Sequence, residues 1–389
     1  MNWPNFDDVL IAGAVEVAYR RAPGELTTSD LLAQAFGEAI RNAGFSTKDV
    51  DGLGVASFTL APDHAIDLAW RLGISPRWCM DDCHGGASGI NLLQHAVRAI
   101  QGGDANLIVL VSGDRFAPED FRRLVDNYNR TTATYLRPLP SGGPNSLFAM
   151  LTQRHAAHHG LERADYGAIC VAQRAWAAQN PGAVYRAPMQ IDDYLAAPLV
   201  ADPLGRFDCV PVVSGANALI LARADLVRAP VNIKVRALQS LYNFDHQQAD
   251  GWRTSLAVIA ADLWKQAGAL PREMDVVSVY DDYPVMVLAQ LADLGFAPDG
   301  DLRALIGRIG ARELRVNTSG GQLSVGQAGA AGGMHGLVEA IVQLRGDAGE
   351  RQVPDARLAV VSGYGMVQYR YGMCANAVVL ERSEQGGRR

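Results

Sequence analysis

Cys83-His84-Gly85-Gly86-Ala87-Ser88-Gly89 is the segment of this chain that decides its fold. The glycines in it allow positive φ angles or a close approach of the backbone to another group. Residues 90–102 repeat apolar side chains at helical spacing, and residues 105–111 are almost continuously apolar, which predicts a helix and then a strand buried on both faces. The N–H groups at the start of such a helix favour an anion or a nucleophile beside the turn. A tight packing turn explains the same glycines, and the segment alone leaves both interpretations open.

The size and composition of the chain indicate a folded protein without a strongly charged surface. It has 389 residues, which exceeds one ordinary domain and suits two of about 190 residues each. Hydrophobic residues make up 49% and charged residues 20%, and the formal net charge of -6 argues against extensive nucleic-acid binding. The N-terminus lacks the features of a signal sequence, and no apolar run approaches the length of a membrane span. We therefore expect a cytoplasmic protein that binds neither nucleic acid nor a membrane.

The cysteine and histidine residues give little support to a disulfide framework or a metal site. The five cysteines are few and scattered, and no Cys-x-x-Cys pair occurs. His155, His158 and His159 lie close together in the predicted helix 147–160, but no carboxylate or cysteine joins them at a repeating offset. A solvent-exposed helix face explains these histidines better than a metal site does. We expect no bound metal.

Predicted strands and helices alternate along the chain. Strands are predicted at residues 9–17, 50–57, 105–113, 219–222, 231–237, 276–280, 359–362 and 375–381, and helices at 31–44, 65–72, 90–102, 147–160, 166–180, 191–197, 252–268, 285–294 and 334–344. This alternation predicts the α/β class. Because the second half repeats the pattern of the first, we predict one half over residues 1–225, including a loop region over about 115–210, and a second half over 226–389.

A glycine-rich loop in the second half carries a resemblance to a known family. Its segments are Asn317-Thr318-Ser319-Gly320-Gly321-Gln322-Leu323-Ser324, Val338-Glu339-Ala340 and Gln343-Leu344-Arg345-Gly346, with support from Asn180-Pro181-Gly182 and Asp208-Cys209. The chain resembles the thiolase superfamily, and within it the sterol-carrier-protein-X thiolase-like branch of lipid-transfer proteins. The resemblance implies two fused αβαβα halves that form a five-layered core, and usually a homodimer, which we expect to form through the strand at 105–111. It also implies a coenzyme A thioester as substrate and no permanently bound cofactor.

The four positions that carry thiolase chemistry are all replaced in this chain. The resemblance aligns Gly86 with the nucleophilic cysteine, and Cys83 lies three residues too early. The second motif becomes Tyr280-Asp281-Asp282-Tyr283, and the third, Gly-His-Pro, becomes Gly326-Gln327-Ala328. The fourth position, a cysteine, falls near Tyr369, with Tyr364 and Tyr371 close by. Without a thiolate no acyl-enzyme can form, so we do not expect thiolysis or Claisen condensation by the usual route.

Cysteine-less members of this branch imply a different reaction, the retro-aldol cleavage of a β-hydroxyacyl-CoA to a shorter acyl-CoA and a ketone or aldehyde. The reaction needs a base for the β-hydroxyl, donors for the enolate oxygen and a proton source for the α-carbon. By the resemblance, Tyr280, Tyr283 and Tyr369 transfer protons, Asp281 is a second candidate base, and Gln327 donates to the enolate oxygen. Residues His84, Gly86, Gly326 and Gly372 are expected to contact the substrate.

Two other functions fit the loss of every thiolase group. The chain can be a non-catalytic subunit that binds acyl-CoA or lipid, or an atypical acyl transferase. Relatives of the aldolase kind work with a separate protein that has an OB-fold and a zinc ribbon, so we expect such a partner here. The residues do not name the acyl group: a steroid side chain is the family precedent, and an aromatic or branched group satisfies the same residues.

Overall fold

The computed structural model describes residues 4–384 except 63, 127–129, 131, 137, 140–142, 230, 245–249 and 368–371. The strands are β1 (Val9–Glu16), β2 (Gly52–Ala56), β3 (Trp78–Asp82), β4 (Leu107–Asp114), β5 (Leu199–Ala201), β6 (Leu204–Gly205), β7 (Gly215–Arg223), β8 (Val231–Tyr242), β9 (Val276–Val279), β10 (Leu358–Val367) and β11 (Gly372–Glu384). The α-helices are α1 (Thr28–Asn42), α2 (His64–Leu72), α3 (Ser88–Gly102), α4 (Pro118–Asp126), α5 (Pro144–His159), α6 (Arg163–Ala177), α7 (Ile191–Leu195), α8 (Leu256–Ala267), α9 (Pro284–Asp293), α10 (Leu302–Gly310), α11 (Gly321–Val325) and α12 (Gly332–Arg345).

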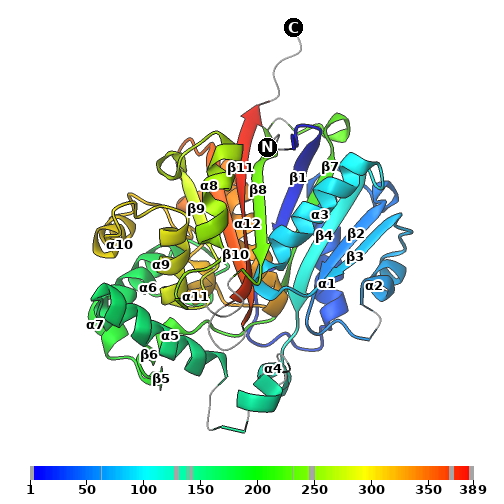
Figure 1. The fold of residues 1–389 in the computed structure, drawn as a ribbon. Helices are drawn as coiled ribbons and strands as arrows, with labels where there is room; N and C mark the ends of the chain where they lie inside the picture. The colour runs from blue at the N-terminus through cyan, green and yellow to red at the C-terminus, as the bar shows by residue number, and fades with distance from the viewer. Residues whose placement is uncertain are drawn as a thin grey trace.

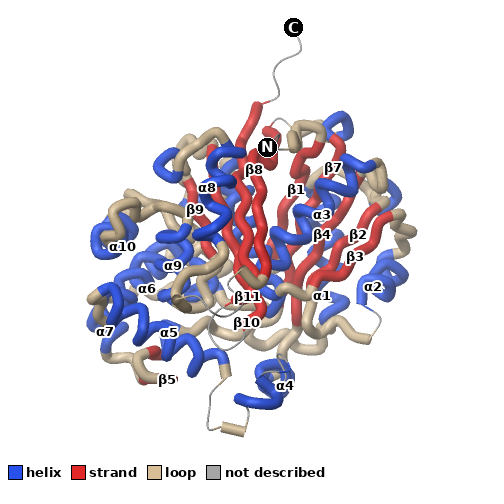
Figure 2. Tube along the Cα trace, viewed as in Figure 1, coloured by secondary structure: helices blue, strands red, loops and turns tan. Residues whose placement is uncertain are grey.

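Nine strands form one sheet in the order β3-β2-β4-β7-β1-β8-β11-β10-β9, which runs through the molecule in Figures 1 and 2. From the edge inward, β3, β2 and β4 are parallel, and β4, β7 and β1 are antiparallel. The strands after residue 231 repeat this order as a mirror image: β9 and β10 are parallel, and β10, β11 and β8 are antiparallel. The two groups meet at β1 and β8, which pair only at Leu10 and Ile11. The α/β class is confirmed, and the repeated order is what a duplicated unit produces.

Helices α3 and α12 lie between the two groups of strands and contact strands of both. Ile90, Leu93 and Val97 of α3 are buried in one hydrophobic core with Leu337 and Ile341 of α12. Full burial of one such side chain stabilises a fold by about 1.5–3 kcal/mol. Helix α1 covers the other side of β1, β4 and β7, and α8 covers the other side of β8 and β11. The layers therefore follow in the order α1, the first group of strands, the paired helices α3 and α12, the second group of strands, and α8.

The strand at 105–113 is β4, and its position corrects the predicted route to a dimer. β4 pairs with β2 on one side and with β7 on the other, so neither of its edges can accept a strand from a second chain. The sheet has two edge strands among the described residues: β3, which pairs only with β2, and β9, which pairs with β10 and forms one isolated bridge to Val316. The prediction that residues 105–111 join two subunits is therefore wrong. Strand β3 was not predicted, because Trp-Cys-Met-Asp-Asp lacks the alternation of apolar and polar residues that is typical of a half-buried strand.

Helices α4 to α7 and the β5-β6 hairpin form a region beneath the sheet in Figure 1 and lie within the predicted loop region. The prediction of a solvent-exposed helix face is wrong for His155 on α5. This residue is buried, with Nδ1 2.8 Å from the Tyr166 hydroxyl. His158 stacks on Trp252, with 4.1 Å between ring centroids. In the described part of the chain, no three His, Cys, Asp or Glu side chains are arranged to hold a metal ion.

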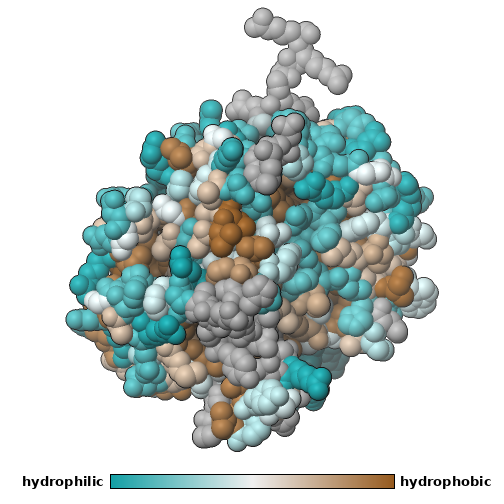
Figure 3. Space-filling view, viewed as in Figure 1, coloured by the Kyte–Doolittle hydropathy of each residue, from teal (hydrophilic) through white to brown (hydrophobic). Residues whose placement is uncertain are grey.

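The molecular surface mixes residue types. Hydrophobic patches on the face in Figure 3 are small and separated by hydrophilic residues. The largest exposed apolar side chains include Trp70, which is 80% exposed, and Ile66, which is 68% exposed, both on α2 beside the edge strand β3. No helix among the described residues is both long enough and apolar enough to cross a membrane.

The boundary predicted near residue 225 lies in the connection between β7 and β8 and stays a prediction.

Candidate active site

The turn before α3 is so closely packed that Gly86 can carry no side chain. A Cβ atom there would lie 2.5 Å from Cζ of the Tyr280 ring and against the backbone oxygen of Tyr364. Gly333 and Gly363 in turn pack on the backbone of Gly86. The glycines thus serve a packing turn. The space that a side chain at position 86 would need is occupied by the ring of Tyr280.

A cavity of about 270 Å³ opens beside this turn. The backbone of Gly85, Gly86 and Gly329 forms part of its wall, and its other lining residues are Phe58, Phe121, Leu124, Val125, Pro144, Asn145, Cys209, Val210, Val212, Tyr280, Asp282, Tyr283 and Gln327. Polar groups therefore gather beside Gly86, and apolar side chains line much of the remaining wall. Ligand sites combine an apolar lining with a few placed polar groups in this way.

Tyr280 and Gln327, both predicted as site residues, meet in the cavity. Gln327 Nε2 donates to the Tyr280 hydroxyl at 2.8 Å and to Gln322 Oε1 at 3.3 Å. Both amide hydrogens of Gln327 are thereby engaged within the protein, so in this arrangement the amide holds Tyr280 instead of donating to a substrate oxygen. In this pair the Tyr280 oxygen accepts the hydrogen bond from the Gln327 amide.

Tyr283 forms a rigid wall of the cavity. Its hydroxyl donates to Asn145 Oδ1 at 2.6 Å, and its ring stacks on Phe148 with 4.2 Å between centroids. Burial raises the pKa of Tyr283 well above its ordinary value, so this phenol stays neutral. The structure therefore gives Tyr283 a packing contact and a hydrogen bond to Asn145, which holds the wall in place.

Asp281 does not reach the cavity. It is buried on the opposite side of the segment, where it accepts hydrogen bonds from the N–H groups of Gln322 and Leu323 and from Gln173 Nε2, at 2.9, 3.3 and 3.0 Å. Burial raises its pKa to about 6. Asp281 caps the first turn of α11 and so fixes the loop that carries Gln327; the geometry does not fit the base predicted from the sequence.

Asp282 and Tyr364 were missed by the sequence reasoning. Asp282 lines the cavity, and its Oδ1 accepts a hydrogen bond from the buried Tyr364 hydroxyl. Burial is the main cause that raises the pKa of Asp282, to about 8. The signal was present in the sequence: in an extended segment, residues two apart share a side, so Tyr280 and Asp282 face the cavity while Asp281 faces away.

The other predicted residues lie around the cavity or outside the described chain. His84 belongs to a separate cluster, in which Nδ1 lies 3.0 Å from Asp82 Oδ2 and the side chain is 37% exposed; its pKa is raised by the hydrogen bond to Asp82. Gly326, with φ of +111°, packs on Val213 and does not line the cavity, although it precedes Gln327. Gly372 begins β11, and Tyr369 lies outside the described residues.

A wider cleft of about 730 Å³ adjoins the cavity and shares Phe58 and Leu124 with it. Its lining is mixed, with leucines and threonines beside Arg115, Asp120 and Arg123. The buried Asp114 fixes the junction: it accepts from the N–H groups of Phe58 and Thr59 at 2.8 Å and from that of Ala330 at 2.7 Å. Asp114 thus holds the Phe58 wall and the loop of Gln327 in one position.

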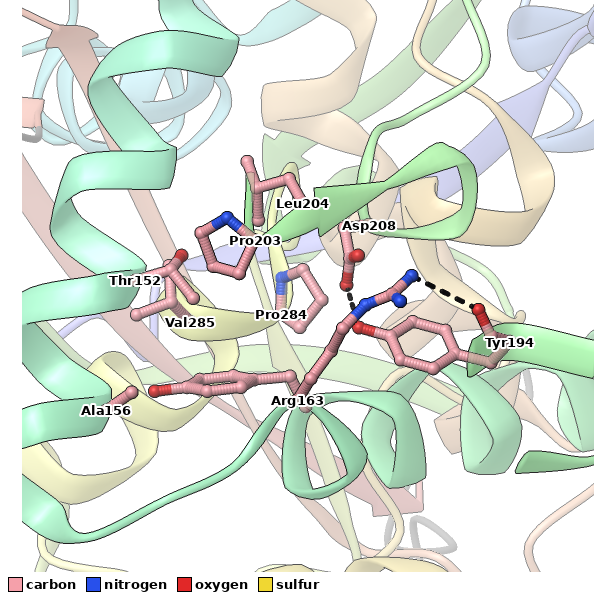
Figure 4. A pocket seen from close by; sticks show the side chains of 10 residues that line it. Thr152, Ala156, Arg163, Tyr194, Pro203, Leu204, Asp208, Pro284 and Val285 are labelled. Carbon is pink, nitrogen blue, oxygen red and sulfur yellow. Dashed lines mark hydrogen bonds between the residues drawn. The ribbon is translucent and has the colours of Figure 1, made fainter. Parts of the chain in front are cut away.

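A third cavity, shown in Figure 4, lies among α5, α6, α7 and the start of α9. Its volume of about 50 Å³ is far below the roughly 300 Å³ of ligand pockets. Beside it, the Tyr194 hydroxyl donates to Asp208 Oδ1 at 2.5 Å, and the Arg163 guanidinium lies 5.2 Å above the Tyr194 ring. Because Asp208 directly precedes Cys209, this network anchors one wall of the candidate active site.

Comparisons with known proteins agree with this architecture. Residues 241–381 match the family described as Thiolase C-terminal domain-like. The chain is 31% identical over 378 residues to a 17-hydroxy-3-oxo-4-pregnene-20-carboxyl-CoA lyase of Mycobacterium tuberculosis, covering 91% of this chain and 95% of that protein. It is 29% identical over 378 residues to a steroid side-chain-cleaving aldolase of Thermomonospora curvata, covering 91% of this chain and 94% of the other.

Comparison with solved structures shows the same fold. A solved structure described as an Ltp2-ChsH2(DUF35) aldolase matches with a TM-score of 0.81 and 24% identity, over 96% of this chain and 98% of that one. The fold, the match over nearly the whole length of the lyase and the replaced thiolase positions together show that this chain belongs to the thiolase superfamily, in the branch of sterol-carrier-like and steroid side-chain-cleaving proteins.

Proposed function

We propose that the protein is an acyl-CoA carbon–carbon lyase that cleaves a β-hydroxyacyl-CoA by a retro-aldol reaction, without a covalent intermediate. The observation that carries the proposal is the position of Gly86, where the ring of Tyr280 fills the space of a nucleophile. A thiolase needs that nucleophile to hold the acyl group, whereas a retro-aldol cleavage needs only proton transfer and stabilisation of an enolate. Relatives that match most of the chain are named as a lyase and an aldolase.

The reaction moves one proton and breaks one bond. A base removes the proton of the β-hydroxyl, the Cα–Cβ bond breaks as the carbonyl of the ketone or aldehyde forms, and the electron pair passes into the thioester enolate. A proton then adds to Cα and releases the shorter acyl-CoA. In this proposal Tyr280 is the group that exchanges a proton with the substrate oxygen, with Gln327 fixing its hydroxyl at 2.8 Å. Tyr369 remains a second candidate from the sequence.

The dimensions of the site support a large substrate. The cavity beside Gly86 and the wider cleft that adjoins it have volumes of about 270 and 730 Å³. A pantetheine arm and a bulky acyl group need such a continuous space, and the steroid substrates in the relatives' names are of this kind. We therefore propose a steroid side-chain CoA thioester as the substrate class, handled in the cytoplasm, with backbone groups at Gly86 close to the reacting atoms.

We also propose two protein contacts. A second copy of the chain joins through the edge strand β3, whose outer side has no partner strand among the described residues. A separate OB-fold and zinc-ribbon protein assists the reaction; this is supported by the matching solved structure, whose description names ChsH2(DUF35) beside Ltp2. Sedimentation of the purified chain tests the first contact: a species of twice 41.7 kDa is expected, and a monomer at micromolar concentration contradicts it.

The activity is tested by incubating the chain, alone and with a co-expressed DUF35 protein, with a 17-hydroxy steroid side-chain CoA thioester. Liquid chromatography with mass spectrometry should detect the steroid ketone and the shorter acyl-CoA in equal amounts. Tight binding of the thioester without either product, in both preparations, would replace the lyase by a non-catalytic acyl-CoA-binding subunit. Release of free coenzyme A with transfer of the acyl group would instead indicate an acyl transferase.

A further inference from the structure

Asp282 lies in the candidate active site, but the reaction steps described above give it no role. Its carboxyl group lines the cavity together with Gly86, Tyr280 and Gln327. The buried Tyr364 hydroxyl donates to Oδ1, and the Tyr364 ring packs edge-on against Tyr280 with 5.1 Å between centroids. This contact fixes the carboxyl plane and leaves Oδ2 as the oxygen that carries the proton when the acid is neutral.

The surroundings of Asp282 favour the protonated form. Asp281 precedes it with a second carboxyl group, Cys209 lines the same cavity, and the phenols of Tyr283 and Tyr364 are close enough to interact with it electrostatically. Burial raises its pKa to about 8 and Asp281 adds to the rise, while hydrogen bonds from Tyr364 and from backbone N–H groups oppose it. At pH 7 the group is therefore mostly a neutral acid that faces the substrate space.

We propose that Asp282 is a catalytic residue that delivers the proton to the α-carbon of the enolate, with Tyr364 as the positioning residue that orients it. In the step, the Asp282 O–H bond breaks, a Cα–H bond forms with the electron pair of the enolate, and Asp282 becomes a carboxylate. In this cycle Tyr280 acts as the phenolate. The proton that it accepts from the β-hydroxyl then passes to Asp282 through the cavity, which restores both groups and balances the cycle. The inference rests on the proposed lyase function.

The step is measured without the cleavage reaction, by following the exchange of the α-hydrogens of propionyl-CoA in D₂O by mass spectrometry. The wild-type protein should catalyse this exchange, because it is the reverse of enolate protonation. Asp282→Asn keeps the size of the side chain and should slow the exchange about 10²–10⁴-fold, while the affinity for propionyl-CoA changes little. Tyr364→Phe should move the rising limb of the pH profile of exchange to higher pH. Exchange begins with the carboxylate form of Asp282, and the substitution removes the hydrogen bond that opposes the rise in its pKa.

Asp293→Asn is the matched control, because Asp293 is another carboxyl with a pKa raised by burial, to about 7, and lies at the far end of α9. This variant should exchange propionyl-CoA at the wild-type rate with an unchanged pH profile. If wild-type protein cleaves the steroid thioester but Asp282→Asn exchanges as fast as wild type, the role of Asp282 is wrong and the lyase function stands. If wild-type protein binds propionyl-CoA and neither exchanges nor cleaves, both proposals fail. Both outcomes are interpreted only for an Asp282→Asn protein that is folded, as shown by an unchanged circular dichroism spectrum.

Discussion

Tyr280 is the residue on which the proposed reaction depends most directly, because its ring fills the space beside Gly86 and its hydroxyl is held by Gln327 at 2.8 Å. Tyr280→Phe removes the hydroxyl and keeps the ring that fills the space. We expect kcat for the steroid thioester to fall about 10²–10⁴-fold with KM changed little, as for the loss of a general acid or base. Gln327→Ala should lower kcat as well, because it releases the hydroxyl. Unchanged kcat in Tyr280→Phe would remove Tyr280 from the reaction.

Gly86 tests the steric part of the argument. Gly86→Ala places a methyl group against the Tyr280 ring and the Tyr364 backbone, and overpacking of this kind costs about 1–3 kcal/mol in unfolding free energy. Urea denaturation should show this loss. Gly102→Ala, in the last turn of the following helix α3, meets nothing closer than 3.7 Å and should change the stability by less than about 1 kcal/mol. Equal stability of both variants would show that the turn has room for a side chain.

At this scale the sequence placed Tyr280 and Gln327 in one candidate site without predicting their contact. The structure brings them within 2.8 Å of each other, and their catalytic roles stay predictions. Asp281 was expected to act as a base, yet it caps α11, because the extended backbone turns it away from the cavity. The contact of Tyr364 with Asp282 joins residues 82 positions apart, and no local pattern indicates such a pair.

Among the elements, α4 controls the passage between the cavity and the wider cleft, because its Leu124 lines both. Leu124→Trp should narrow this passage. We expect KM for the steroid thioester to rise at least tenfold, while turnover of 3-hydroxybutyryl-CoA, if it is a substrate, stays within a factor of about three, since steric exclusion of a bulky group costs about 1–3 kcal/mol or more. Equal effects on both thioesters would show that the cleft does not hold the acyl group.

Helix α5 carries a pH-dependent contact. Burial lowers the pKa of His155 to about 3, below its value of about 6.5 in the unfolded chain, so the unfolded state binds more protons between these pH values. The contribution of neutral His155 is therefore complete above about pH 6.5 and is lost as the pH falls toward 3. Urea denaturation should show wild-type protein losing stability relative to His155→Gln over this range. A difference that does not vary with pH would contradict the burial of His155.

The helices and strands that were predicted, and those that were missed, show the limit of prediction from sequence periodicity. Helices α3 and α12 and strands β4 and β7 were predicted because their apolar periodicity is long and regular. β3 was missed because it is an edge strand with a polar sequence, and α11 was missed because it consists of only five residues within a glycine-rich loop. The burial of His155 depends on Tyr166, which lies on the next helix.

In the whole molecule, duplication explains why a simple alternation of strands and helices predicted the architecture. The same strand order occurs twice, and α3 and α12 pack together at the centre, which brings the turn of Gly86 against Gly333 and the Tyr280 segment. The site is therefore built where the two halves meet. The sequence resemblance gave this meeting point, but the identity of the edge strand came from the pairing of β2, β3 and β4 alone.

The central claim is that carbon–carbon cleavage proceeds without an acyl-enzyme, and one measurement tests it most directly. Intact-mass spectra are recorded while the protein, with its DUF35 partner, turns over the steroid thioester, and the Cys83→Ser variant is assayed in parallel. We predict that no acyl adduct appears on the chain at any time and that Cys83→Ser retains nearly full turnover. An adduct on Cys83, together with loss of activity in Cys83→Ser, would contradict the account and assign a displaced thiolase nucleophile in its place.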